Sequence, residues 1–189
     1  EYAKGNYLKG AMPLYMKPNR KISLTDVMDG MRDHYEGTPF DIQNELGAGP
    51  YNMPYRPTPL SFKVDEKTFF NERPISTQQT SFCFIGQMRN FVPDFYAGIV
   101  WWTNDDPNMA PFTPVYCTVT EIPACYTKIE DEQDDVTFSW NSAFWVQNTV
   151  SNMVYPYYSK IFPDLKKERD DISFRVINKC YKNREKMTD

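Results

Sequence analysis

A run of six hydroxyl and amide side chains at residues 76–81 is the stretch of this sequence best suited to contact a polar ligand. Side chains of these types are costly to bury unless each finds a hydrogen-bond partner. The run falls in a strand predicted over residues 75–88, where alternation would send Gln79 and Ser81 to one face of a sheet and Thr80 to the other. Two interpretations stay open: one face lines a polar pocket for a peptide terminus, or the strand has a solvated face.

Arg89 follows the same strand and is the fourth candidate for substrate contact. A guanidinium group binds a carboxylate through two parallel hydrogen bonds, and the neighbouring Asn90 adds an amide. The candidate substrate-binding residues are therefore Gln79, Thr80, Ser81 and Arg89.

No residue of this chain is predicted to be catalytic. Nucleophilic catalysis requires a Ser, Cys or Thr with a nearby base, and His34 is the only histidine. We expect His34 to lie at a helix end, where a cation interacts favourably with the helix dipole. A metal site of Asp33, His34 and Glu36 is disfavoured because consecutive residues of a helix point in different directions. The sequence contains none of the motifs of zinc proteases, phosphate-binding loops, dinucleotide folds or Gly-x-Ser-x-Gly hydrolases. No cofactor is expected.

The four cysteines, Cys83, Cys117, Cys125 and Cys180, show no C-x-x-C spacing. Cys117 and Cys125 could bridge a hairpin in an oxidising compartment, and the alternative is that the thiols are free and buried. The compartment stays open between a secreted or periplasmic location and the cytoplasm.

The composition of the 189 residues indicates a folded chain that binds neither nucleic acid nor membrane. Hydrophobic residues make up 41% of the sequence, the net charge is −4, and no basic block stands out. No apolar run approaches the roughly 20 residues that a membrane-spanning helix needs. The chain begins with Glu1 rather than Met, so we expect it to lie within a longer precursor.

Local patterns predict helices and strands in separate blocks. Ser23 should cap a helix over 24–35 that stops near Gly37, since apolar residues repeat there at helical spacing. Pro156 should break a second helical stretch that runs from residue 139 toward 162. The other predicted elements are strands at 75–88, 97–103 and 115–122, a turn at 104–108, and a terminal helix from Pro163 to Arg184. This order favours an α+β fold over alternating α/β.

Several segments resemble, in the right order, the signature blocks of the dipeptidase A family, which is related to the secernins. Together they cover most of residues 12–165. The blocks lie at 31–39, 47–51, 54–56, 76–82, 87–89, 102–106, 114–117 and 142–146.

The resemblance implies an N-terminal-nucleophile fold, a four-layer αββα sandwich with mostly antiparallel sheets and flanking helices. It also implies hydrolysis of dipeptides by a cysteine exposed as the first residue after processing, with its free α-amine as the base, so no histidine is needed. The cysteines of this chain are internal. We therefore expect residues 1–189 to be the carboxy-terminal portion of one catalytic domain, with the nucleophile-bearing portion absent. Residues 102–104 read Trp-Thr-Asn where the family more often has Trp-Phe-Gly.

Three functions remain open at this point. The chain is part of a cysteine dipeptidase that contributes scaffold and substrate pocket, or the scaffold hydrolyses another amide, such as an N-acyl amino acid or a bile-salt-like conjugate. The third is a non-catalytic module that binds a partner or assembles several copies. The expected partners are a dipeptide and the nucleophile-bearing portion, and the chain alone should expose an apolar sheet edge or face that this portion covers.

Overall fold

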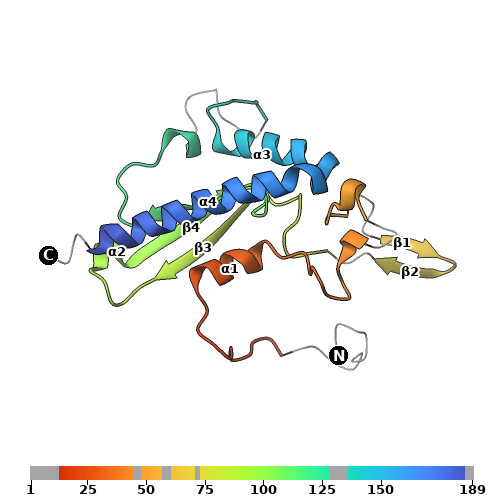
Figure 1. Cartoon of the computed structure of the whole chain (residues 1–189), viewed down its shortest axis with the longest axis horizontal. Helices are drawn as coiled ribbons and strands as arrows, with labels where there is room; N and C mark the ends of the chain where they lie inside the picture. The colour runs from red at the N-terminus through yellow and green to blue at the C-terminus, as the bar shows by residue number, and fades with distance from the viewer. Residues whose placement is uncertain (1–12, 45–47, 57–60, 71–72, 128–135, 186–189) are drawn as a thin grey trace.

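The computed structural model describes residues 13–44, 48–56, 61–70, 73–127 and 136–185 (Figure 1). Helices pack on one face of a three-stranded antiparallel sheet, and a separate two-stranded hairpin projects from one end. This arrangement confirms the α+β prediction. The helices are α1 (Leu24–Met31), α2 (Asp94–Ala97), α3 (Ala143–Val154) and α4 (Tyr158–Glu185), and the strands are β1 (Ser61–Val64), β2 (Lys67–Phe70), β3 (Phe82–Met88), β4 (Gly98–Asn104) and β5 (Thr113–Tyr116). Short 3₁₀ helices lie at Ile42–Asn44, Pro50–Asn52, Ala124–Tyr126 and Tyr155–Tyr157.

The sheet has the strand order β3-β4-β5. Phe82 pairs with Asn104 at one end of the β3–β4 ladder, and Met88 pairs with Gly98 at the other. β4 lies within one residue of its predicted bounds at each end, whereas β5 is shorter and earlier than the predicted strand at 115–122.

The strand predicted over residues 75–88 is wrong in its first half, because β3 begins only at Phe82. The backbone amides of Ile75 and Ser76 donate instead to the carbonyl of Asp33, at 3.1 and 3.2 Å. The amide of Thr80 then donates to the carbonyl of Thr77, which closes a turn. The polar run is therefore an ordered loop, and the alternation expected for Gln79, Thr80 and Ser81 does not apply.

Helix α1 starts where the sequence predicts and ends earlier. Ser23 Oγ accepts a hydrogen bond from the amide of Asp26 at 3.2 Å, and the Asp26 carboxylate accepts one from the amide of Ser23 at 2.7 Å. This reciprocal capping satisfies two free amides of the first turn. The helix stops at Met31 rather than at residue 35, because the Asp33 side chain accepts from the amide of Tyr35, which has a φ of 63°.

The break predicted at Pro156 is confirmed. The 3₁₀ turn Tyr155–Tyr157 separates α3 from α4. The helix start predicted at Pro163 is wrong, because α4 already begins at Tyr158. A proline at the sixth position of a helix lacks only one amide hydrogen bond, and α4 continues through it to Glu185. No helix of the described residues is long and apolar enough to span a membrane.

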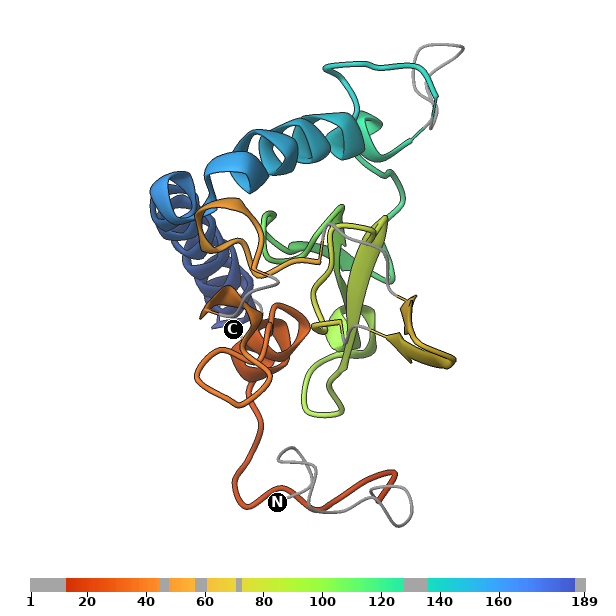
Figure 2. The same ribbon diagram turned by 90° about the vertical axis from the view of Figure 1, so that its right-hand side faces the viewer.

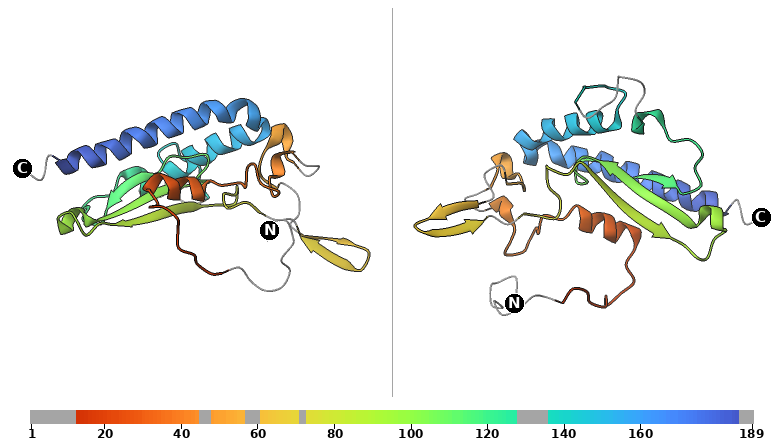
Figure 3. Two further views of the ribbon diagram at one scale, coloured as in Figure 1. Left: turned by 60° about the horizontal axis from the view of Figure 1, so that its bottom comes forward. Right: turned by 180° about the vertical axis from the view of Figure 1, so that it is seen from behind.

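Two apolar clusters form the core. The first lies between the sheet and helices α1 and α4, and the second joins α3, α4 and the segment before β1. Figure 2 shows the helices gathered on one side of the sheet, and the back view in Figure 3 shows strands that no helix covers. The described residues contain no second sheet stacked on this one, so the sandwich partner stays a prediction. The buried members are Met28, Cys83, Ile99, Trp101 and Phe112 in the first cluster and Met53, Tyr55, Met109, Val154 and Tyr158 in the second.

Candidate functional site

The loop that follows β4, residues 105–110, is buried along its whole length although half of its side chains are polar. Polar side chains from the segments after α1, before β1 and before β3, and from α3 and α4, form hydrogen bonds to it. We use the name Asp106 cluster for the side chains that surround the carboxylate of Asp106 in this loop. Its members are Tyr55, Ser76, Asp106, Asn108, Tyr155 and Tyr158.

The Asp106 carboxylate accepts four hydrogen bonds. The hydroxyls of Ser76 and Tyr55 donate to it, the hydroxyl of Tyr155 donates at 3.1 Å, and the amide of Asn108 donates at 3.0 Å. Burial raises the pKa of Asp106, while the bonds from Ser76 and Tyr55 oppose that rise. Burial also raises the pKa of Tyr55 and Tyr155. The tyrosine hydroxyls therefore remain protonated donors at neutral pH.

Asp105 fastens the same loop to α3. Its backbone is in the left-handed region, with a φ of 62°. Its carboxylate accepts hydrogen bonds from the hydroxyl of Ser151 and from Asn148 Nδ2, the latter at 3.0 Å. Its amide donates to the carbonyl of Ser81 at 2.8 Å. Asp105 thus joins the end of the sheet, the polar loop before β3 and helix α3.

Two buried arginines hold the loop from the helix side. Arg32 Nε donates to the carbonyl of Pro107 at 2.9 Å, and Arg169 Nη1 donates to the carbonyl of Asn108 at 2.5 Å. Arg169 also donates to the Asp170 carboxylate at 2.7 Å through Nη2. Burial, followed by repulsion from Arg169, lowers the pKa of Arg32 to about 10. The Arg32 guanidinium therefore remains charged at neutral pH and keeps its hydrogen bond to the loop there.

His34 lies three residues beyond α1 and is buried. Its Nδ1 is 3.1 Å from Glu36 Oε1, and its ring meets the ring of Tyr55 edge-on, with centroids 4.9 Å apart. Burial would raise the pKa of Glu36, but hydrogen bonds from His34 and the backbone outweigh it and set the pKa at about 2. This geometry fits a packing role for His34. Among the described residues, no group of three His, Cys, Asp or Glu side chains is placed to hold a metal ion.

Three of the four predicted substrate-binding residues lie together. Gln79 and Thr80 belong to the turn that the Thr80 amide closes on Thr77, and Ser81 follows it, next to Asn104 and Asp105 at the end of β4. Gln79 and Ser81 are exposed, and Thr80 is half-buried with Oγ1 3.4 Å from the hydroxyl of Thr77. Their role as substrate contacts stays a prediction.

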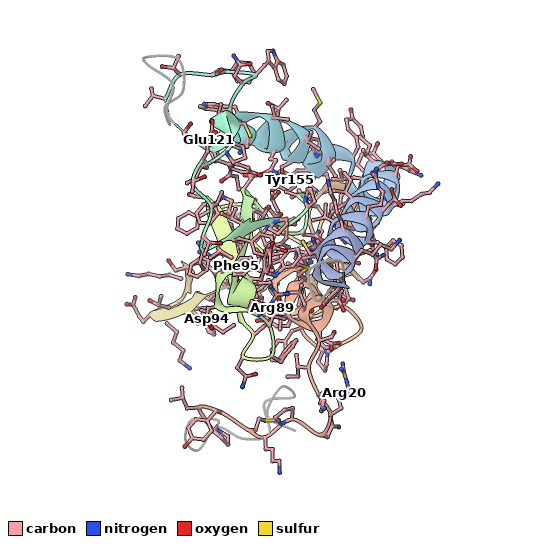
Figure 4. The ribbon with its side chains drawn as sticks, turned by 90° about the vertical axis from the view of Figure 1, so that its left-hand side faces the viewer. Arg20, Arg89, Asp94, Phe95, Glu121 and Tyr155 are labelled. Atoms are coloured by element: carbon pink, nitrogen blue, oxygen red, sulfur yellow. The ribbon has the colours of Figure 1, made fainter. Side chains whose placement is uncertain are left out.

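Arg89 lies at the opposite end of β3. The seven residues of that strand separate it from Ser81, so the two Cα atoms are about 26 Å apart at the usual rise of a strand. Its guanidinium is buried and donates to the carbonyl of Tyr96 in α2. Figure 4 shows Arg89 beside Asp94 and Phe95 and well apart from Tyr155 of the Asp106 cluster. The structure therefore does not bring Arg89 to Gln79, and its role in substrate contact also stays a prediction.

Comparison with known proteins agrees with the resemblance seen in the sequence. The model of peptidase family C69 matches residues 3–171. This chain belongs to peptidase family C69. It is 26% identical over 147 residues to a probable dipeptidase of Latilactobacillus sakei, 29% over 132 residues to probable dipeptidase B of Lactococcus lactis subsp. lactis (strain IL1403), and 26% over 170 residues to dipeptidase A of Lactobacillus helveticus.

The aligned parts cover 78%, 70% and 90% of this chain but only 26%, 24% and 30% of these three C69 relatives. The chain therefore spans less than a third of their length.

Four of the segments that carry the C69 resemblance meet in space at the Asp106 cluster. Tyr55, Ser76 and Asp106 come from three different blocks and are joined directly by hydrogen bonds. The block at 31–39 adds His34, whose ring packs on Tyr55. The block at 142–146 opens α3, from which Gln147 accepts a hydrogen bond from the amide of Asn104 at 3.1 Å. Sequence patterns missed this convergence because residues 104–108 were interpreted only as a turn.

The four internal cysteines of this C69 chain differ in their exposure. All four are free, which leaves Cys117 and Cys125 unbridged. Both of these are exposed, contrary to the alternative of buried thiols, whereas Cys83 is buried. Burial raises the pKa of Cys83 and of Cys180, and a raised pKa keeps a thiol in its less reactive protonated form.

Proposed function

We propose that this chain is part of a cysteine dipeptidase, in which it supplies scaffold and substrate-contacting surface. The observation that carries the proposal is the match to peptidase family C69 over residues 3–171. The names of the relatives from Latilactobacillus sakei, Lactococcus lactis and Lactobacillus helveticus support it, since all three are dipeptidases or probable dipeptidases.

The attacking thiol belongs to another part of a longer polypeptide. Two features support this step: burial raises the pKa of the Cys83 and Cys180 thiols, and this chain covers only a small share of each relative. In the mechanism that the resemblance implies, a leading cysteine gives its proton to its own α-amine and attacks the carbonyl carbon of the peptide bond. The amine product leaves with a proton, and water then hydrolyses the thioester to release the carboxylic acid.

The part of this chain that we assign to the substrate is the end of the turn before β3 with the residue after it: Gln79, Thr80 and Ser81. Two bonds hold this turn in place: the amide of Asp105 donates to the carbonyl of Ser81, and the hydroxyl of Ser76 donates to Asp106. A rigid turn with exposed amide and hydroxyl groups can bind the polar ends of a dipeptide at little entropic cost. Arg89 is kept as a separate candidate contact at the far end of β3.

The test is hydrolysis of a dipeptide series by the longer polypeptide, with N-acyl amino acids as the competing substrates. Gln79→Ala and Ser81→Ala should each raise KM for dipeptides several-fold. Both variants should unfold at the same temperature as the parent protein. Ser159→Ala, on the exposed side of α4, is the matched control and should change neither KM nor the unfolding temperature. Preference for N-acyl amino acids would favour the broader amidohydrolase, and absence of both activities would favour a non-catalytic module.

A further inference from the structure

Within the described residues, β3 is an edge strand of the three-stranded sheet. The amide of Asp105 donates to the carbonyl of Ser81 at 2.8 Å just before β3, and the amide of Arg89 donates to the carbonyl of Ala97 at 2.9 Å just after it. Together with the register of the ladder, these bonds show that Cys83, Ile85 and Gln87 direct their backbone groups toward β4. The backbone groups of the intervening residues point the other way, where the described residues provide no neighbouring strand. The intervening residues are Phe82, Phe84, Gly86 and Met88.

The same residues form an exposed apolar surface on the outer face of the sheet. Phe82, Phe84 and Met88 are 52%, 57% and 80% exposed. The rings of Phe82 and Phe84 stack on Trp102, with centroids 4.9 and 6.4 Å away. Exposed aromatic groups of this size, gathered on one strand pair, mark an interaction surface.

The β3 edge has none of the protection that natural edge strands carry. Residues 82–88 contain no charged residue and no proline, and the strand is seven residues long. Isolated edges are usually short or protected by lysine, proline or a bulge, because unpaired backbone groups recruit another strand. The back view in Figure 3 shows β3 as the outermost strand of its sheet. An edge of this kind is expected only where a further strand pairs with it.

We propose that a β-strand from the nucleophile-bearing portion of the same polypeptide pairs with the outer edge of β3. This inference rests on the proposed function, which requires such a portion. The L. sakei relative supports this occupant, since only 26% of its length aligns with this chain. The rest is long enough to provide the strand. The pairing would satisfy the outward backbone groups of Phe82, Phe84, Gly86 and Met88.

The shape of the edge indicates the kind of strand that fits. A Cβ atom added at Gly86 would meet only Met88 Cε, at 3.7 Å, so the surface has open space there between Phe84 and Met88. A large apolar or aromatic side chain on the incoming strand would fill that space, as cross-strand partners of glycine do. Charged side chains directly opposite would be left without partners, since residues 82–88 have no charge. Because β3 starts directly after Ser81, the incoming strand would also bring the nucleophile-bearing portion next to the proposed substrate turn.

Residue-resolved hydrogen exchange of the longer polypeptide tests the pairing without any mutation. If a strand is added, the amides of Phe82, Phe84, Gly86 and Met88 should exchange as slowly as those of Cys83, Ile85 and Gln87. If β3 is a true edge, exchange should alternate, with the first set at least tenfold faster than the second. That alternation would overturn the proposal. Protection that appears only as protein concentration rises, together with a dimer mass in light scattering, would show that a second copy occupies the edge and would also overturn it.

A pair of substitutions provides an independent check. Phe84→Lys places a charge on the outer edge, whereas Phe174→Lys does the same on α4, where Phe174 is 67% exposed. In the longer polypeptide, Phe84→Lys should lower the unfolding temperature and Phe174→Lys should not. Equal effects would contradict the pairing. Dipeptide hydrolysis by the parent protein distinguishes failure of the strand pairing from failure of the proposed dipeptidase function. If the protein hydrolyses dipeptides but the outward amides of β3 exchange fast, only the added strand is refuted. If those amides are protected but the protein has no dipeptidase activity, only the enzyme proposal is refuted.

Discussion

The hydroxyl of Tyr55 donates a hydrogen bond to the carboxylate of Asp106, and the two residues are 51 positions apart in the chain. Both side chains are fully buried. The hydroxyl of Ser76 donates to the other oxygen of the same carboxylate. One acidic side chain thus connects the segment before β1, the loop before β3 and the loop after β4.

Replacement of Asp106 by asparagine should destabilise the fold strongly. An amide has one acceptor oxygen where the carboxylate has two, and its NH₂ group would face hydroxyls that now donate. Leaving buried donors without acceptors should lower the free energy of unfolding by about 2 kcal/mol or more. Urea unfolding followed by tryptophan fluorescence measures this, with Asp164→Asn on the exposed side of α4 as the control. Equal stability of the two variants would show that Asp106 is not the centre of the network.

The pH dependence of stability should include a contribution from Glu36. Its pKa is about 2 in the folded protein and 4.5 in an unperturbed chain. A depressed pKa contributes stability above the unfolded pKa, and that contribution is lost as pH falls from about 4.5 through 2. Glu36→Gln should therefore lose less stability than the parent protein over that interval. The exposed Glu168→Gln should follow the parent curve.

Elements fixed by contacts between residues close in the sequence could be predicted, whereas elements fixed by contacts between distant residues could not. The start of α1 and the break at Pro156 were predicted because Ser23 with Asp26, and the proline ring itself, act within one helical turn. The loop at 75–81 was predicted as a strand because its backbone partner, the carbonyl of Asp33, lies more than forty residues away. The sequence alone does not reveal such contacts.

The candidate site shows the same division. Gln79, Thr80 and Ser81 could be selected as candidate ligand contacts from their polar side-chain types. The buried partners that hold their turn, Asp105 and Asp106, were missed because consecutive acidic residues before a proline are typical of an exposed turn. A signal was available: a polar loop directly after an aromatic strand must find partners if the strand lies in the core.

Alkylation should distinguish the two exposed cysteines from the buried Cys83. Cys117 and Cys125 are exposed, whereas Cys83 is buried and burial raises its pKa. At pH 8, iodoacetamide should modify the first two at least tenfold faster than Cys83. Mass spectrometry of peptides from the native protein gives the rates, and the same experiment in denaturant should equalise them. Fast native labelling of Cys83 would contradict its place in the core.

Two glycine-to-alanine substitutions should change stability in opposite directions. Gly30 lies inside α1, and a Cβ atom there would meet nothing within 4 Å. Alanine should therefore raise the free energy of unfolding by about 0.5–1 kcal/mol, because it restricts the unfolded chain and favours helix.

At Gly49 a Cβ atom would lie 2.6 Å from Met53 Cε and 2.9 Å from Met53 Cβ. The flexible end of the methionine can move, but its Cβ atom moves only with the backbone, and Gly49 is bridged to Met53 through its amide. Gly49→Ala should lower stability by about 1–3 kcal/mol, the usual cost of overpacking. Thermal unfolding of both variants beside the parent protein measures the contrast. Stabilisation by Gly49→Ala would mean that the turn carrying Pro50 and Tyr51 is not packed against Met53 as described.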